Sequence, residues 1–177
     1  WGDDAIVYPQ GTKLETDQML GFDQLIVGRN KTRRGSNAKL RRLHGYHDKY
    51  PEVGDRLVCL KNKHDLGLLN GAIFYVSDIE GVMDEKVHMS IRPEDDKASI
   101  EVIAHAQPFT GDEIPFYEIN DAQQFDFGYA LTCHKSQGSQ WKNVVIFDES
   151  WCFKAERNRW LYTAITRASD RVAVVRM

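Results

Sequence analysis

Two short segments near the end of the chain carry polar and basic side chains in patterns that suit contacts with phosphate groups or bases. Residues 129–138 read Tyr-Ala-Leu-Thr-Cys-His-Lys-Ser-Gln-Gly, and residues 159–168 read Arg-Trp-Leu-Tyr-Thr-Ala-Ile-Thr-Arg-Ala. Between them lies Val144–Phe147, an apolar run typical of a buried strand. Each segment therefore places polar side chains at the edge of a core element, where they can reach a ligand.

The first segment predicts a strand that ends near Thr132 and turns into a short helix over residues 134–137. The start of such a helix exposes backbone N–H groups that attract anions. Thr132 can add a hydroxyl group, and His134 and Lys135 can add side-chain donors. Gly138 allows close backbone approach or a left-handed exit. The alternative is a capped helix whose polar side chains only face solvent.

The second segment predicts a helix over residues 158–166. Apolar residues recur in it at spacings of three and four and predict a core-facing side: Leu161, Ala164 and Ile165. Arg167 follows Thr163 by four residues and shares another face with it. A guanidinium group there can bind phosphate through two hydrogen bonds. The alternative is an ordinary cation that the helix dipole stabilises.

The elements around these segments are predicted from composition and periodicity. A buried strand is expected over residues 23–27, followed by a helix over residues 31–44 with Ala38, Leu40 and Leu43 on its apolar side. Residues 29–42 hold seven Lys and Arg residues and no acid. After Asn120, strands alternate with helices, which indicates a parallel sheet and an α/β fold.

The charge balance divides the chain into three parts. Residues 1–50 carry nine Lys and Arg against six Asp and Glu, residues 51–119 six against fourteen, and residues 120–177 eight against six. The acidic part contains short apolar runs and an Asn70-Gly71 turn signal, which together predict a small β-barrel. We therefore predict one domain from residues 1–50 and 120–177, interrupted by a barrel over residues 51–119.

Several classes of protein are excluded by composition. The overall net charge of −3 argues against a generic nucleic-acid binder. No apolar run approaches the roughly 20 residues that a membrane span needs, and no secretory signal opens the chain. Three widely spaced cysteines, Cys59, Cys133 and Cys152, fit neither a disulfide framework nor a zinc site. We expect a cytoplasmic protein of bacterial or phage-like origin, without a membrane partner. Because the chain begins with Trp1, we also expect it to be a fragment of a longer protein.

Together these segments resemble conserved segments V and VI of superfamily 1 DNA helicases, especially the RecD-like branch (similar to the C-terminal half of exonuclease V alpha subunits). Residues 30–37, Asn-Lys-Thr-Arg-Arg-Gly-Ser-Asn, resemble segment IV, in which the first and last Asn flank the nucleotide cleft. Residues 54–62 and 69–71 resemble the SH3-like subdomain between segments IV and V. The resemblance implies a RecA-like (P-loop NTPase-like) parallel-sheet domain, interrupted by an SH3-like β-barrel.

That resemblance implies the second motor domain of an ATP-dependent DNA helicase, which acts in DNA repair or recombination by moving along single-stranded DNA and unwinding duplexes. The 177 residues contain no Gly-x-x-x-x-Gly-Lys-Ser/Thr phosphate loop. ATP and Mg²⁺ would therefore be held mainly by an N-terminal motor domain of the same protein, and the fragment alone would be inactive. A RecD-type protein would also contact nuclease subunits. The remaining alternative is a non-enzymatic nucleic-acid-binding module.

The resemblance also assigns roles to single residues. Arg167, with Arg33 as a second contact, would stabilise charge on the transferred phosphoryl group. Gly138 and Gln140 would join Arg167 at the nucleotide, although many relatives carry Glu where this chain has Gln140. The nucleic-acid contacts would be Thr132, His134, Lys135, Asn30 and Lys61. Whether the acidic barrel touches DNA at Lys61 is left open, because its charge disfavours broad phosphate contact.

One further motif imitates a magnesium site. The run Val144–Phe147 is followed by Asp148 and Glu149, as in a Walker B strand. In superfamily 1 helicases that strand belongs to the first motor domain. We therefore expect Asp148 and Glu149 to end a strand at the surface, without a metal ion.

Overall fold

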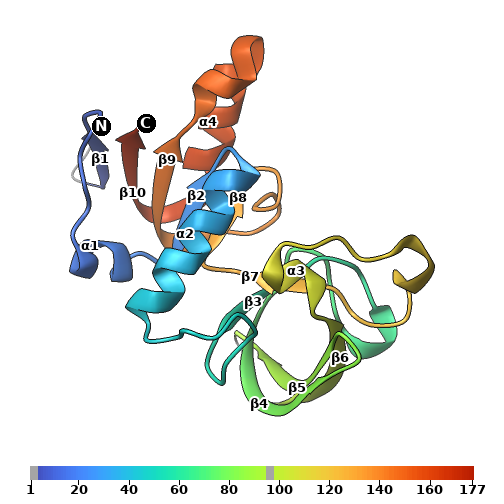
Figure 1. The fold of residues 1–177 in the computed structure, drawn as a ribbon. Helices are drawn as coiled ribbons and strands as arrows, with labels where there is room; N and C mark the ends of the chain where they lie inside the picture. Colours follow the sequence, from blue (N-terminus) through green and yellow to red (C-terminus); the bar gives the residue numbers. More distant parts are fainter. Residues whose placement is uncertain (1–3, 95–97) are drawn as a thin grey trace. The chain divides into compact units, whose positions relative to one another are not determined.

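The computed structural model describes residues 4–94 and 98–177. The chain divides into two compact units (Figure 1): one unit contains the residues up to His44 and from Tyr129 onward, and the other contains Gly45–Gly128. These divisions differ from the predicted ones at 50/51 and 119/120. The second division lies later because strand β7 (Phe125–Phe127) pairs antiparallel with β3 (Arg56–Cys59), inside the second unit.

The first unit is built on a five-stranded sheet in which every pairing is parallel, with the order β1-β10-β9-β2-β8. Its strands are β1 (Ala5–Tyr8), β2 (Gln24–Val27), β8 (Ala130–Thr132), β9 (Trp141–Asp148) and β10 (Ala168–Arg176). The two apolar runs recognised in the sequence, β2 and β9, lie next to each other. Ile26 and Ile146 are fully buried and pair across the two strands. The parallel α/β sheet predicted from the sequence is confirmed.

The described residues of this unit form the helices α1 (Thr16–Leu20), α2 (Asn30–Leu43) and α4 (Arg157–Ile165) and the 3-10 segment η3 (Ser150–Glu156). Helix α2 follows β2 directly, and α4 runs into β10. Both helices begin and end within a residue of the predicted bounds. Their position between consecutive parallel strands is the crossover arrangement that such sheets require.

The buried side of α2 differs from the predicted one. Ala38 is exposed, whereas Asn37 and Arg41 are buried together with Leu40. The Asn37 side chain explains the difference, because its Nδ2 donates to Ala130 O at 3.2 Å while Ala130 N donates to its Oδ1 at 2.6 Å. Strand β8 lies at the end of the sheet, so this amide satisfies edge groups that would otherwise stay unpaired.

The second unit contains a five-stranded antiparallel sheet with the order β6-β5-β4-β3-β7. Besides β3 and β7 it comprises β4 (Ile73–Met83), β5 (Lys86–Pro93) and β6 (Ile100–His105). Short helices accompany the sheet: η1 (His64–Leu66), α3 (Gln107–Thr110) and η2 (Phe116–Glu118). Phe125, Leu57 and Ile91 are fully buried and form part of its core. The predicted β-rich character agrees with this sheet, and the SH3-like assignment stays a prediction.

Within residues 4–94 and 98–177, no helix is both long enough and apolar enough to cross a membrane. Among the described residues, no disulfide bond involves Cys59, Cys133 or Cys152.

Candidate functional site

The predicted site residues of the first unit lie at both edges of the parallel sheet. Asn30 and Thr132 lie where β2 and β8 end, whereas Gln140 and Arg167 lie just before β9 and β10 begin. Since all five strands run in the same direction, β8, β2 and β9 end at the same edge, at Thr132, Val27 and Asp148. In open parallel sheets this carboxyl edge is where ligands bind. The following loops carry segments IV and V and the approach to segment VI.

Segment V forms a series of turns after β8 rather than the predicted short helix. Ser136 N donates to Thr132 O at 3.0 Å, and the Ser136 hydroxyl donates to Cys133 O at 2.8 Å. The next backbone bond, from Gln137 N to His134 O, is long at 3.5 Å. Gly138 then takes a left-handed conformation with φ 91°, which ends any helical continuation. A side chain at Gly138 would meet no atom within 4 Å, so the backbone conformation, not crowding, favours glycine.

Arg167 joins segments V and VI. Its Nε donates to Thr163 O, its Nη1 to Ser139 O and its Nη2 to the Thr166 hydroxyl, each at 3.2 Å. The Arg167 carbonyl oxygen accepts a bond from Trp141 N at 2.9 Å. The half-buried guanidinium is therefore held in place from both segments. A guanidinium has five N–H groups, so each terminal nitrogen keeps one N–H beyond these bonds.

Gln140 and Cys133 lie against the same junction. Gln140 Nε2 donates to Thr166 O at 3.3 Å, so the predicted nucleotide contacts Gly138, Gln140 and Arg167 occupy one region. Burial raises the pKa of the Cys133 thiol to about 11, although the positive charge of Arg167 opposes the shift. Cys133 is thus a neutral thiol that packs in the core and not a nucleophile.

The predicted nucleic-acid contacts are divided between the two units. Asn30 begins α2 and its Oδ1 accepts a bond from Arg33 Nε at 3.4 Å. Thr132 pairs with Val27 in the sheet, next to the start of segment IV. His134 is exposed, Lys135 is partly exposed, and the His134 ring lies 6.1 Å from that of Phe153. Lys61 belongs to the second unit, where its Nζ donates to Asn120 Oδ1 at 2.6 Å.

Glu149 is the site residue that sequence reasoning placed wrongly. It was expected at the surface, but it is completely buried. Its carboxylate accepts hydrogen bonds from Gly28 N and Arg29 N, each at 2.9 Å, and from the Thr32 hydroxyl at 2.5 Å. Arg29 adds an Nε bond at 2.7 Å and an ion pair through Nη2 at 2.6 Å. A carboxylate with five donors can be buried because its lone pairs are fully used.

The environment of Glu149 keeps it ionised. Burial alone would raise the pKa of the carboxyl group, but hydrogen bonds from Thr32, Arg29 and Gly28 outweigh burial and leave the pKa below its ordinary value. The same contact raises the pKa of Arg29. The approach is so close that a side-chain carbon at Gly28 would lie 2.8 Å from Glu149 Cβ. Glu149 therefore ties segment IV to the loop that leads into segment VI.

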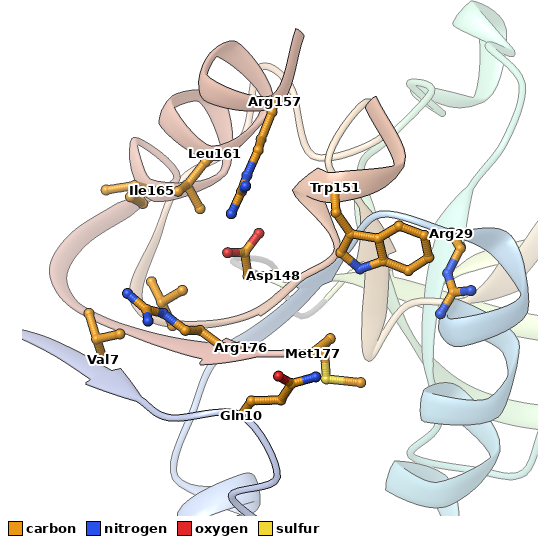
Figure 2. Close-up of a pocket in the computed structure, with 11 residues that line it drawn as sticks. Val7, Gln10, Arg29, Asp148, Trp151, Arg157, Leu161, Ile165, Arg176 and Met177 are labelled. Carbon is orange, nitrogen blue, oxygen red and sulfur yellow. The ribbon is translucent and has the colours of Figure 1, made fainter. Parts of the chain in front are cut away.

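A pocket of about 930 Å³ opens beside this cluster, at the carboxyl ends of β9 and β10 (Figure 2). Arg29, Arg157 and Arg176 line it together with Asp148 and the half-exposed Trp151. The sequence did not point to these residues as a group, because they come from five separate elements or loops. The available signal was an aromatic side chain, Trp151, three residues after the acidic strand end at Asp148.

The comparisons with known proteins agree with these segments. Residues 127–175 match the UvrD-like helicase C-terminal domain family. The ATP-dependent RecD2 DNA helicase of Deinococcus radiodurans is 29% identical over 119 residues, which are 67% of this chain and 13% of that protein. The chain therefore spans a small part of this curated relative.

Solved structures of Pif1 helicases share the fold. The Candida albicans protein aligns with 86% of this chain and 44% of its own, at 18% identity and a TM-score of 0.57. A Bacteroides Pif1 bound to single-stranded DNA aligns with 91% and 45%, at 16% identity and a TM-score of 0.53. A structure of Bacteroides Pif1 with ADP-AlF3 and single-stranded DNA aligns with 85% and 39%, at 17% identity and a TM-score of 0.51.

The parallel sheet, its carboxyl-edge loops and the Pif1 likeness define the first unit as a RecA-like domain. The match at residues 127–175 and the RecD2 relative support a likeness of this chain to the C-terminal domain of superfamily 1 helicases. The resemblance drawn from segments V and VI is thereby confirmed.

Proposed function

We propose that the chain is the second motor domain of an ATP-dependent DNA helicase that couples ATP hydrolysis to movement along single-stranded DNA and to duplex unwinding. ATP and Mg²⁺ are then held mainly by another motor domain of the same protein, and this chain forms one wall of the cleft. The Bacteroides Pif1 structure with ADP-AlF3 and single-stranded DNA supports this proposal, because a protein of the same fold binds both ligands. Arg167 supplies the arginine that stabilises negative charge on the transferred phosphoryl group.

The observation that carries the proposal is the state of the Arg167 guanidinium. Three hydrogen bonds orient it, to Thr163 O, Ser139 O and the Thr166 hydroxyl, while one N–H remains on each terminal nitrogen. Two N–H groups on neighbouring nitrogens suit bidentate contact with phosphate oxygens. A guanidinium fixed in advance loses little side-chain entropy when the phosphate arrives, which favours transition-state stabilisation.

In the same proposal, the other predicted site residues contact either the nucleotide or the DNA strand. Gly138 and Gln140 lie beside the nucleotide, with Gln140 offering an amide where many relatives carry a carboxylate. Asn30, Thr132, His134 and Lys135 contact the DNA strand, and Arg33 is the second phosphate contact. The second unit acts as an SH3-like subdomain, and its contribution to DNA binding is through Lys61.

The test compares the intact protein with the 177-residue chain alone. The intact protein should hydrolyse ATP faster when single-stranded DNA is added, whereas the isolated chain should show no hydrolysis because it has no phosphate loop. DNA-stimulated hydrolysis by the isolated chain would contradict a two-domain ATP site. A gene that encodes no phosphate loop upstream of this chain would instead favour a nucleic-acid-binding module without motor activity.

A further inference from the structure

The pocket beside Glu149 has the composition of a nucleotide-binding site and is outside the residues assigned above. Its polar lining consists mainly of three arginines and one aspartate, so it is positively charged although the chain has a net charge of −3. Its volume of about 930 Å³ lies at the upper end of the range for small-molecule sites. Leu161, Ile165 and Val174 form an apolar part of the wall. Such a site suits a ligand with an anionic group and a flat apolar group.

Trp151 provides the flat surface. Its side chain is 54% exposed, which is unusual for the largest apolar residue type. The guanidinium carbon of Arg29 lies 5.2 Å from the centre of its ring, and Arg29 is in turn held by the buried Glu149. Figure 2 shows Arg29 on one side of the indole and Asp148 and Arg157 on the other. The ring is therefore held by Arg29, and both side chains line the pocket.

Arg157 and Arg176 provide the positive charge. Within the described part of the chain, the Arg157 side chain bonds only through Nε, which donates to the Ser150 hydroxyl at 3.1 Å, so its terminal nitrogens remain for a ligand. The Arg176 side chain forms no hydrogen bond or ion pair with any residue in the ranges 4–94 and 98–177. By contrast, Asp148 is partly occupied, because its Oδ1 accepts a bond from Ser150 N at 3.0 Å. Two arginines near one aspartate leave a net attraction for phosphate.

We propose that this pocket binds one nucleotide unit of single-stranded nucleic acid, with the base stacked on Trp151 and a phosphate held by Arg157 and Arg176. The pocket lies at the same carboxyl edge of the β-sheet as Asn30 and Thr132. A single strand of nucleic acid that crosses these predicted contacts therefore continues into the pocket. Aromatic stacking combined with a basic groove is how proteins bind single strands without sequence preference. The inference rests on the proposed function and extends it, because it names additional DNA contacts beyond segments IV and V.

The experiment measures binding of a short fluorescent oligothymidine to the intact protein by anisotropy, without ATP and at several salt concentrations. Trp151→Ala should weaken binding about tenfold, and Arg176→Ala should reduce the slope of log affinity against log salt by about 0.7. Tyr162→Ala and Arg159→Ala are matched controls, because both residues are exposed on α4 and do not line the pocket. These controls should bind like the wild type.

Two further probes separate the ligand sources. With an abasic strand of the same length, Trp151→Ala should have no effect, whereas Arg176→Ala should still weaken binding. Thymidine monophosphate should compete only weakly, and tight competition by it would overturn the strand assignment in favour of a free nucleotide. If Trp151→Ala and Arg176→Ala both bind the strand as tightly as the wild type, the pocket assignment is overturned but the proposed function is not. No binding of any strand by the wild type would also contradict the DNA contacts in the proposed function.

Discussion

Arg29 and Glu149 are 120 residues apart in the sequence, yet the Arg29 guanidinium meets the buried Glu149 carboxylate at 2.6 Å. Gly28 N and the Thr32 hydroxyl donate to the same carboxylate. This contact joins the loop after β2 to the loop after β9, at the carboxyl edge of the sheet, where the proposed nucleic-acid contacts Asn30 and Thr132 lie. Glu149 is therefore a positioning residue, and three predictions depend on it.

Replacing Glu149 with Gln should lower the free energy of unfolding by about 2–4 kcal/mol, measured by urea denaturation. The loss follows because an amide removes the negative charge and turns an NH₂ group toward Arg29 and the backbone N–H groups. Glu156→Gln is the control, since that carboxylate is 65% exposed and pairs with an exposed Arg159. It should change stability by less than about 0.5 kcal/mol. Equal effects of the two substitutions would mean that the Glu149 cluster adds no stability.

The stability of the protein should also depend on pH through Glu149. Its folded-state pKa lies below the ordinary value of 4.5, so the unfolded state takes up the proton first as pH falls. The stabilisation is therefore complete above about pH 5 and is lost as pH falls through the folded-state pKa. Unfolding free energies of wild type and Glu149→Gln, measured between pH 7 and pH 3, should converge toward acid. Parallel curves would show that Glu149 does not titrate as described.

A methyl group at Gly28 should destabilise the fold. In Gly28→Ala the new carbon would lie 2.8 Å from Glu149 Cβ and 3.2 Å from the Phe153 ring, so the loop must shift, at about 1–3 kcal/mol. Gly35→Ala is a matched control inside α2, where a new side chain would meet nothing within 4 Å. That substitution should stabilise the protein by about 0.5–1 kcal/mol, because alanine favours helix. Changes of opposite sign in the unfolding free energies of Gly28→Ala and Gly35→Ala would support the close approach of Gly28 to Glu149. An unchanged stability of Gly28→Ala would refute it.

Asn37 should be needed for the sheet edge rather than for the nucleotide cleft. Asn37→Ala leaves the buried Ala130 N–H and carbonyl without their side-chain partner, which should reduce stability by about 1–3 kcal/mol. The exposed neighbour Lys39 serves as control, and Lys39→Ala should be nearly neutral. Hydrogen exchange at the Ala130 amide should accelerate in Asn37→Ala alone. Unchanged exchange there would contradict the edge-capping role.

Local patterns were sufficient to predict the elements that build the parallel sheet. The apolar runs that became β2 and β9 and the helix that became α4 depend on neighbouring residues, so periodicity reveals them. The helix expected over residues 134–137 failed for a local reason as well, because Gly138 adopts a left-handed backbone and the preceding bond is long. The short strand β1 and helix α1 carry little periodic signal and were not predicted.

Long-range pairing explains what the sequence could not reveal. In the sequence, Glu149 follows a strand, as many exposed acidic residues do. Its burial is possible only because of hydrogen-bond donors in and next to segment IV, more than a hundred residues earlier. Strand β7 belongs to the second unit because β3 pairs with it, which no local pattern signals. The Trp151 pocket likewise collects residues from separate parts of the chain.

The most direct measurement is the DNA-stimulated ATPase rate of the intact protein carrying Arg167→Ala. Arg159→Ala on the same segment is its control, because that exposed side chain pairs only with Glu156 among the described residues. Arg167→Ala should lower turnover about a thousandfold or more while the affinity for single-stranded DNA stays near that of the wild type and of Arg159→Ala. Turnover within a few-fold of the wild type, in a variant that still binds DNA, would contradict the role of Arg167 at the phosphoryl group.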